Sequence, residues 1–289
     1  MTSIARVGVV AKARLQDATP HLVNVEKWLG ERGIDVVFET ATAALMPANS
    51  HRRVADREPL VAEVGLVLVL GGDGTLLSTS RAVARAAIPV LGVNLGSLGF
   101  LTEVPLAELY DALEEVDQKR ASVESRALVQ CQLMREGNCL LKYAALNDVI
   151  VNKSAIARLN DYDLYIDKVL VTEYKADGLI VSTPTGSTAY SMAAGGPILT
   201  PSVDAFVITP VSPHSLTHRP LVVRDSVEIE IVVKTGADTA YLSVDGQVGM
   251  PVRDGDRVVC RKSEYKVQLL RIRRAFFEVL RTKLKWGQR

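Results

Sequence analysis

Residues 64–77 read Val-Gly-Leu-Val-Leu-Val-Leu-Gly-Gly-Asp-Gly-Thr-Leu-Leu, an apolar run followed by a glycine-rich turn and a second apolar segment. The run over residues 64–70 is typical of a buried parallel strand, and the apolar spacing of residues 76–87 predicts a helix. A strand, a glycine turn and a helix direct backbone N–H groups and a helix N-terminus towards one point, where a phosphate can bind. The turn also carries a carboxylate, Asp73, which suits a hydroxyl or a metal beside the phosphate. A turn without further function is the alternative, because Gly and Asp are common turn residues.

Strand and helix patterns alternate on both sides of this unit, over the first 120 residues. Strands are predicted at residues 7–10, 34–38, 64–70 and 89–94, and helices at residues 21–32, 76–87 and 105–116. The small and polar residues 40–58 predict a loop with a short helical piece. Alternation of this kind predicts an α/β N-terminal domain with a parallel, Rossmann-like sheet that helices cover on both faces.

The pattern changes after about residue 120, where alternating β-branched segments are separated by Gly and Asp. Two hairpins are predicted within residues 128–145 and 163–174, and further strands at 227–233, 239–244, 257–261 and 266–272. This pattern predicts an all-β C-terminal domain that is antiparallel and sandwich-like. Residues 275–285 regain helical spacing. We therefore expect an α/β domain over residues 1–122, a β-rich domain over 123–272, and a helix within 273–289 that packs back on the first domain.

Composition limits the classes of protein to consider. The chain has 289 residues, a net charge of +1 and 48% hydrophobic residues, which suits two globular domains and gives no basic face for nucleic acid. Its apolar runs are far shorter than the ~20 residues of a membrane-spanning helix, so no membrane partner is expected. Three cysteines without CxxC spacing and an N-terminus without a signal-peptide pattern predict a cytoplasmic protein.

A second informative segment is Asp177–Ser191, in which an apolar strand leads into five hydroxyl residues around Pro184 and Gly186. Hydroxyl groups both donate and accept hydrogen bonds, so such a cluster can surround a sugar or a phosphate. The alternative is a Ser/Thr-rich loop that caps a helix beginning near Thr188.

Taken together, these segments resemble the NAD kinase family of the bacterial type. The resemblance rests on ordered matches between about residues 65 and 250: Gly-Gly-Asp-Gly-Thr-Leu-Leu at 71–77, Gly-Val-Asn-Leu-Gly at 92–96, Gly-Phe-Leu-Thr at 99–102, Asn147-Asp148, Asp177-Gly178, Pro184–Ser191, Gly-Gly-Pro at 195–197 and Asp-Gly-Gln at 245–247. The first of these also resembles lipid kinases and phosphofructokinases, whereas the segment 184–191 is far more specific.

The resemblance implies transfer of the γ-phosphoryl group of ATP to the 2′-hydroxyl of the adenosine ribose of NAD, which gives NADP. It also implies a site in the cleft between an α/β domain and a dinucleotide-binding β domain. A divalent metal, usually Mg²⁺, accompanies ATP in this family, and the resemblance assigns no metal ligand here. Family members commonly form homodimers or homotetramers through the β domain.

The resemblance also assigns roles to residues. Asp73 is the proton acceptor, and Gly71, Gly72, Gly74 and Thr75 surround the phosphates. The NAD-binding positions lie on the turn and in the β domain: Asp73, Gly74, Asn147, Asp148, Arg158, Lys175, Asp177, Thr188, Ala189, Tyr190, Ser191, Met192, Ala193 and Gln247. Asp148 stands where the family has Glu, so its shorter side chain reaches less far.

Each of these residues also has a structural interpretation. Asn147, Asp148, Asp177 and Gln247 favour turns in general. Arg158 and Lys175 suit a solvated surface, and Tyr190 suits a hydrophobic core.

Three other functions are alternatives to NAD phosphorylation. A lipid kinase needs an apolar acceptor pocket or a basic membrane-facing helix, and no such helix stands out. A dinucleotide sensor without turnover would not need Asp73. A hydride-transferring dehydrogenase needs Gly-x-Gly-x-x-Gly after the first strand, and residues 9–16 lack those glycines.

Overall fold

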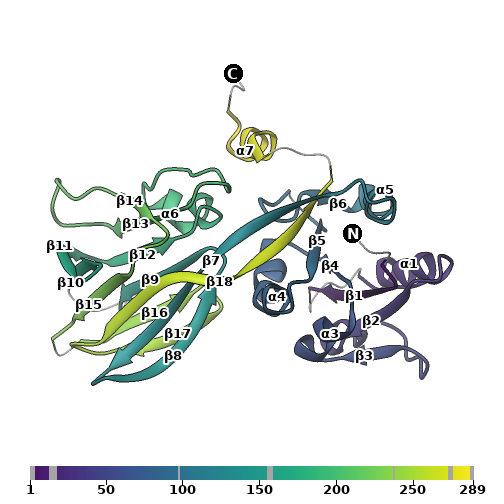
Figure 1. The fold of residues 1–289 in the computed structure, drawn as a ribbon, viewed down its shortest axis with the longest axis horizontal. Coiled ribbons are helices and arrows are strands. Elements are labelled where there is room, and N and C mark those ends of the chain that lie inside the picture. The colour runs from purple at the N-terminus through teal and green to yellow at the C-terminus, as the bar shows by residue number, and fades with distance from the viewer. Residues whose placement is uncertain are drawn as a thin grey trace. The chain divides into compact units, whose positions relative to one another are not determined.

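The computed structural model describes residues 4–12, 18–96, 98–154, 159–236, 238–272 and 276–286, and it divides into two compact units (Figure 1). Unit 1 comprises residues 1–125 and 266–289, and unit 2 comprises residues 126–265. The sequence assigned residues 266–272 to the β-rich domain, which differs from this division. These residues join unit 1 because the end of strand β18 (Arg257–Arg271) pairs in parallel with β5 (Pro89–Asn94), Gln268 opposite Pro89.

Unit 1 is built on a parallel sheet, as predicted. Its central strand β4 (Leu66–Leu70) is buried at all five positions, which explains the continuous apolar run. The strand order is β5-β4-β1-β2-β3, with β6 beside β5. The remaining bounds are β1 (Arg6–Ala11), β2 (Asp35–Glu39), β3 (Arg53–Ala55) and β6 (Val104–Pro105).

Helices cover both faces of this sheet. Buried side chains of α1 (Ala18–Gly30) and α5 (Leu109–Asp117) share one core with Val7 and Val9 of β1. Gly8 faces the opposite side, where a Cβ would lie 2.4 Å from Leu60 of α3 (Arg57–Glu63). Helix α3 contacts α4 (Asp73–Ala86) on that side. A parallel sheet between two helical layers confirms the α/β prediction.

The segment 40–58 contains more structure than the predicted loop with a short helical piece. The helical piece is α2 (Thr40–Ala43), but β3 and the start of α3 also lie within these residues. Strand β3 has only three residues and none of them is buried, so it leaves no hydrophobic pattern to detect.

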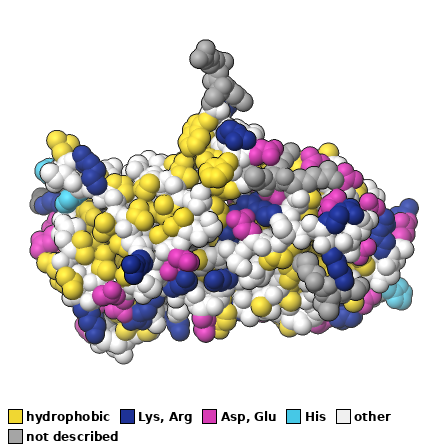
Figure 2. All heavy atoms as spheres, turned by 45° about the horizontal axis from the view of Figure 1, so that its top comes forward, with side chains coloured by type: hydrophobic (Ala, Val, Ile, Leu, Met, Phe, Trp, Pro, Cys, Tyr) yellow, Lys and Arg dark blue, Asp and Glu magenta, His cyan; other side chains and the backbone are white. Residues whose placement is uncertain are grey.

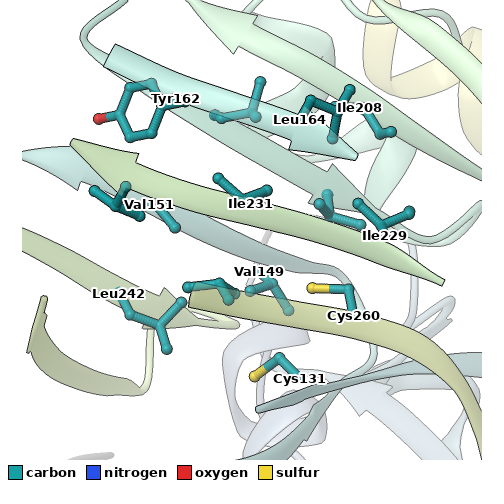
Figure 3. Packing of buried hydrophobic residues seen from close by; sticks show 14 of the residues in the cluster. Cys131, Val149, Val151, Tyr162, Leu164, Ile208, Ile229, Ile231, Leu242 and Cys260 are labelled. Atoms are coloured by element: carbon teal, nitrogen blue, oxygen red, sulfur yellow. The ribbon is translucent and has the colours of Figure 1, made fainter. Parts of the chain in front are cut away.

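Unit 2 contains two antiparallel sheets that share one hydrophobic core (Figure 3). One sheet has the order β14-β13-β12-β9-β16-β17, and the other has the order β11-β10-β15-β18 with β7 beside β18 and β8 beside β7. Val151 and Leu242 enter the core from the first sheet, and Leu164 and Ile231 from the second. This arrangement confirms the antiparallel, sandwich-like prediction.

The strands of unit 2 are most of β7 (Ser122–Arg135), β8 (Asn138–Ala145), β9 (Asp148–Lys153), β10 (Asn160–Ile166), β11 (Val169–Ala176), β12 (Gly178–Ser182), β13 (Ala205–Val211), β14 (Leu221–Arg224), β15 (Ile229–Lys234), β16 (Ala240–Val244), β17 (Val248–Val252) and most of β18. The predicted strands 257–261 and 266–272 are one strand, because the polar residues between them continue β18 without a break. Two short helical turns, Gly186–Thr188 and α6 (Tyr190–Ala193), replace the single helix expected near Thr188.

Helix α7 (Phe276–Leu284) forms where helical spacing predicted it and belongs to unit 1. The ammonium of Lys283 lies 5.8 Å from the ring centroid of Phe100 in the same unit. None of the helices that the structure describes is long and apolar enough to cross a membrane.

Candidate active site

The glycine turn of unit 1 joins the end of β4 to the start of α4. The Gly71 N–H donates to the Val93 carbonyl at 2.9 Å, which fixes the turn to the neighbouring strand. A Cβ on Gly71 would lie 2.5 Å from the Thr75 hydroxyl, so close packing requires glycine there. Helix α4 begins at Asp73, and Gly72 before it has no side chain to cap the first N–H groups.

The carboxylate of Asp73 accepts four hydrogen bonds from one loop, residues 100–102. Oδ1 accepts three of them, from the backbone N–H groups of Leu101 (3.1 Å) and Thr102 (3.0 Å) and from the Thr102 hydroxyl (2.9 Å). Oδ2 accepts one, from the Phe100 N–H at 2.9 Å. Since a carboxylate oxygen offers about two lone pairs, Oδ1 is fully used and Oδ2 has room for one further donor.

Three supports hold the loop against the carboxylate. Gly99 approaches so closely that a Cβ there would lie 2.0 Å from Asp73 Oδ1. The Asn94 amide donates to the buried Thr102 hydroxyl at 3.1 Å, and the Gly99 N–H donates to the Thr102 carbonyl at 3.2 Å. The segments 92–96 and 99–102, which the sequence offered only as part of a resemblance, thus have a physical role in orienting Asp73.

A buried ion pair lies directly after this loop. Arg271 bonds Glu103 at 2.5 Å and Glu124 at 2.6 Å, and the Ile272 N–H donates to Glu103 at 3.1 Å. Burial raises the pKa of Glu103, because desolvation outweighs the attraction of Arg271. These bonds attach the end of β18 to Glu103, the residue that follows Thr102. Sequence reasoning missed this network, since its partners are far apart in the chain.

In unit 2, Asp245 fixes the backbone around Asn147 and Asp148. Its carboxylate accepts hydrogen bonds from the N–H groups of Leu146 (2.9 Å), Asn147 (2.8 Å) and Asp148 (3.2 Å). Asp245 occupies the turn between β16 and β17 with a φ of 52°, a conformation that Asp tolerates better than most residues. The Asp-Gly-Gln turn therefore holds the Asn147-Asp148 pair in place.

Asp148 is a buried carboxyl group with 4% of its surface exposed. Desolvation, together with the nearby charge of Asp245, raises the pKa of Asp148 to about 7. The side chain can therefore change its charge near neutral pH, which is unusual for an aspartate and is common at functional sites.

The hydroxyl residues around Pro184 bond mainly to the backbone nearby. Thr183 donates to the Leu146 carbonyl at 2.5 Å, Ser187 to the Pro184 carbonyl at 2.7 Å and Thr188 to the Thr185 carbonyl at 3.1 Å. A Cβ on Gly186 would lie 2.1 Å from the Asn147 carbonyl oxygen. These contacts bring the segment against the Asn147-Asp148 pair. The hydroxyl groups therefore serve first to build this local structure. The sequence analysis gave such a structural loop as the alternative to a ligand-binding cluster.

The other predicted NAD-binding residues of unit 2 differ in how far they are accessible. Tyr190 is 41% exposed, and Met192 and Ala193 are at least partly accessible. Ser191 is buried, and its hydroxyl is 2.9 Å from the Thr209 hydroxyl. Ala189 connects the two short helical turns.

The remaining predicted side chains are charged or polar; Lys175 is exposed and Asp177 is half-buried. Asp177 pairs with Lys153 at 3.0 Å, and Lys175 lies 3.9 Å from Asp161. Gln247 is exposed in the turn after Asp245. Arg158 lies outside the described residues.

The described residues do not form a metal site of their own, since none of them group three or more His, Cys, Asp or Glu side chains around one point. Mg²⁺ in kinases takes many of its oxygen ligands from water and from the phosphates of the nucleotide.

Two family models match most of the chain. The family model described as "ATP-NAD kinase N-terminal domain" matches residues 7–121, and the one described as "ATP-NAD kinase C-terminal domain" matches residues 146–272. The chain is 51% identical over 292 aligned residues to the NAD kinase of Koribacter versatilis, with both chains fully covered. It is 48% identical over 286 residues to the NAD kinase of Acidobacterium capsulatum, covering 98% of this chain and 99% of the relative.

Two solved structures extend the similarity to the fold. The structure of yeast NADH kinase complexed with NADH matches with a TM-score of 0.87 and 26% identity, covering 100% of this chain and 90% of the other. An NAD kinase from Archaeoglobus fulgidus in complex with ATP matches with a TM-score of 0.75 and 27% identity, covering 95% and 98%. On the family models and these relatives together, the chain belongs to the NAD kinase family.

Proposed function

We propose that the protein is a kinase, a phosphotransferase that converts NAD and ATP to NADP and ADP. The observation that carries the proposal is the orientation of Asp73 at the glycine turn, with Oδ1 fully hydrogen-bonded and Oδ2 able to accept one more donor. We infer NAD and ATP as the substrates because the chain belongs to the NAD kinase family.

In the proposed reaction the 2′-oxygen of the adenosine ribose attacks the γ-phosphorus of ATP. A new P–O bond forms as the bond to the β–γ bridging oxygen breaks, and ADP leaves with that electron pair. Asp73 Oδ2 accepts the hydrogen bond of the 2′-hydroxyl and takes its proton. The transition state of phosphoryl transfer is loose, so orientation of the attacking oxygen matters more than a strong base.

The turn and the helix start suit the phosphates. The residues we assign to phosphate binding are Gly71, Gly72, Gly74 and Thr75. Backbone N–H groups at a helix N-terminus favour anions, and this turn has no Walker-type lysine to do so. Magnesium would enter bound to ATP and neutralise part of the phosphate charge.

Unit 2 would bind the dinucleotide. Asn147 and Asp148 are proposed to hold ribose hydroxyls, because an amide donates and accepts and an ionised carboxylate accepts from two hydroxyls. The remaining proposed contacts with NAD are Gly74, Arg158, Lys175, Asp177, Thr188, Ala189, Tyr190, Ser191, Met192, Ala193 and Gln247. The buried hydroxyl of Ser191 is bonded to Thr209, so we expect its contribution to be indirect.

We also propose a cytoplasmic homodimer or homotetramer. Unit 2 exposes large apolar side chains, among them Val169, Leu170 and Leu216, and hydrophobic side chains gather on one face of this unit (Figure 2). Exposed apolar area of this kind supports association between copies. Sedimentation analysis would give the number of copies.

The experiment for the activity is direct. Purified protein is incubated with ATP, Mg²⁺ and NAD, and NADP is measured with an NADP-specific dehydrogenase. Formation of NADP and ADP in equal amounts is expected. Absence of NADP, with phosphate transferred to diacylglycerol in a parallel reaction, would overturn the proposal in favour of a lipid kinase, an alternative that the relatives do not support.

A further inference from the structure

The loop that bonds to Asp73 leaves β5 and returns to the same strand. Its return is the short strand β6, where Val104 lies opposite Val93. Glu103 is the single residue between this return strand and Thr102, which donates two hydrogen bonds to Asp73. A shift of Glu103 would therefore move the donors that orient the Asp73 carboxylate.

The side chain of Glu103 is held by the end of β18, within unit 1. Arg271 donates to its Oε2 at 2.5 Å, and the Ile272 N–H donates to its Oε1 at 3.1 Å. Arg271 also bonds Glu124, at 2.6 Å. The end of β18 is itself part of the parallel sheet, because it pairs with β5. Both oxygens of Glu103 thus attach the loop to a strand of the sheet.

Burial of this ion pair is costly. The exposed fraction of the side chain is 3% for Glu103 and 9% for Arg271, so both charges are removed from water. Nη2 of Arg271 is also buried and has no hydrogen-bond partner among the residues that the structure describes. Apolar side chains of similar volume often replace a buried ion pair without loss of stability. Stability alone therefore does not explain why two charged groups occupy these positions.

We propose that Glu103 and Arg271 are positioning residues for the phosphoryl transfer. Their ion pair fixes the loop 99–102, and the loop fixes the direction in which Asp73 meets the acceptor hydroxyl. This role rests on the proposed function and adds to it two residues that act only through Asp73. Positioning of this kind matters because phosphoryl transfer depends mainly on the orientation of the reacting groups.

Two variants test the role of the ion pair. The double variant Glu103→Met with Arg271→Met replaces both charges by apolar side chains of similar length. Glu124 then loses its partner, but its side chain is 31% exposed and can be hydrated. The second variant, Glu103→Gln, keeps the size of the side chain. Its NH₂ group must face either the Arg271 guanidinium or the Ile272 N–H, and both are donors, so one hydrogen bond is lost.

A second buried ion pair of unit 1 supplies the matched control. The Arg52 side chain is 7% exposed, and two of its nitrogens bond Glu26 at 2.9 Å each. The bonds that the structure describes for this pair include no residue of the loop 99–102. The control is therefore Glu26→Met with Arg52→Met, which removes the same charges elsewhere in the same unit.

The first readouts are kcat, the KM for NAD and for ATP, and the thermal unfolding midpoint. We expect kcat to fall roughly tenfold in both Glu103 variants, with both KM values near those of the wild type. The unfolding midpoint of the double variant should equal or exceed that of the wild type. The control should keep the wild-type kcat. Wild-type kcat in both Glu103 variants would overturn the proposal, and Glu103→Gln decides alone if the double variant does not fold.

The second readout asks whether the effect passes through Asp73. In an Asp73→Asn background, Glu103→Gln should lower the residual kcat no further, because residues that act through one group are not additive. A further tenfold loss in that background would show that Glu103 acts by another route, and would also overturn the proposal.

Hydrogen exchange separates this proposal from the proposed function. The N–H groups of Phe100, Leu101 and Thr102 all donate to Asp73, so their exchange reports opening of the loop. Their exchange should be roughly tenfold faster in Glu103→Gln and unchanged in the control. If the wild type forms NADP but exchange is unchanged in both Glu103 variants, the proposal fails and the function stands. If the wild type forms no NADP but exchange accelerates as expected, the function fails and the control of the loop by the ion pair stands.

Discussion

The Thr102 hydroxyl donates a 2.9 Å hydrogen bond to Oδ1 of Asp73, the side chain that we propose as the proton acceptor. Together with the N–H groups of Leu101 and Thr102, it occupies that oxygen fully. The proposed reaction therefore uses the other oxygen, Oδ2. Thr102 is a positioning residue in this account, since it acts on the substrate only through Asp73.

The first prediction concerns this positioning. Thr102→Val removes the hydroxyl and keeps the shape, so kcat should fall roughly tenfold, as expected for a small misplacement of a reacting group. The KM for NAD should change little, and Thr102→Ser should restore most of kcat. Thr79→Val is the matched control, because Thr79 is equally buried and, among the residues that the structure describes, its hydroxyl bonds the Thr75 carbonyl of its own helix. Equal kcat in the two valine variants would contradict a positioning role for Thr102.

The second prediction concerns Asp73 itself. In Asp73→Asn the three donors at Oδ1 favour the amide oxygen at that position, which places the NH₂ group where the 2′-hydroxyl should donate. Turnover should fall about 10²- to 10⁴-fold, the range for loss of a general base. Affinity for NAD, measured by calorimetry, should remain close to wild type. Near-normal turnover would show that another group accepts the proton.

The third prediction links Asp148 to stability. The unfolded-state pKa of 3.8 rises to about 7 in the folded chain, so the folded chain binds more protons between these values. The free energy of unfolding should therefore fall as pH rises from about 4 to about 7, by an amount on the order of a few kcal/mol. Asp148→Asn removes this titration. The unfolding free energy of the variant minus that of the wild type should therefore be larger at pH 8 than at pH 4. If this difference is the same at both pH values, the assignment of the titration to Asp148 is wrong.

The fourth prediction links the same titration to NAD binding. Above pH 7 the Asp148 carboxylate is ionised and can accept hydrogen bonds from two ribose hydroxyls. The KM for NAD should therefore rise as pH falls from 8 to 6 in the wild type. In Asp148→Asn it should be higher and nearly flat over this range. A parallel rise in both proteins would place the titrating group elsewhere.

The fifth prediction concerns Asp245, which holds the backbone of residues 146–148. Asp245→Asn tolerates the left-handed φ of this turn but weakens at least one of the three backbone hydrogen bonds. We expect a loss of about 1–3 kcal/mol of stability and a higher KM for NAD, because the proposed ribose ligands become mobile. Asp238→Asn, in an exposed loop of the same unit, serves as the control. An unchanged KM for NAD would show that Asp245 does not position the residues proposed to bind the ribose.

Elements with a strong local pattern were predictable from the sequence. The apolar run before Gly71 predicted β4, and the spacing after it predicted α4, because both signals lie within a few residues. Strand β17 was missed because it contains Gly249 and Pro251, which argue against a strand. Pro251 is tolerated in β17 because this strand lies at the edge of its sheet.

The site was predictable only in part for a related reason. Asp73 stood out in the glycine turn, but three of its four donors are backbone N–H groups, which leave no trace in residue identity. The contacts of Asp245 with residues 146–148 join positions almost 100 residues apart in the chain. Lys12 and Arg57 line one cavity although they lie far apart in the chain.

A crystal structure of the protein with bound NAD would settle whether Asp73 faces the acceptor hydroxyl. We predict that the 2′-oxygen of the adenosine ribose lies within hydrogen-bond distance of Asp73 Oδ2, with the Thr102 hydroxyl still bonded to Oδ1. A dinucleotide bound with its 2′-hydroxyl away from this carboxylate would contradict the account.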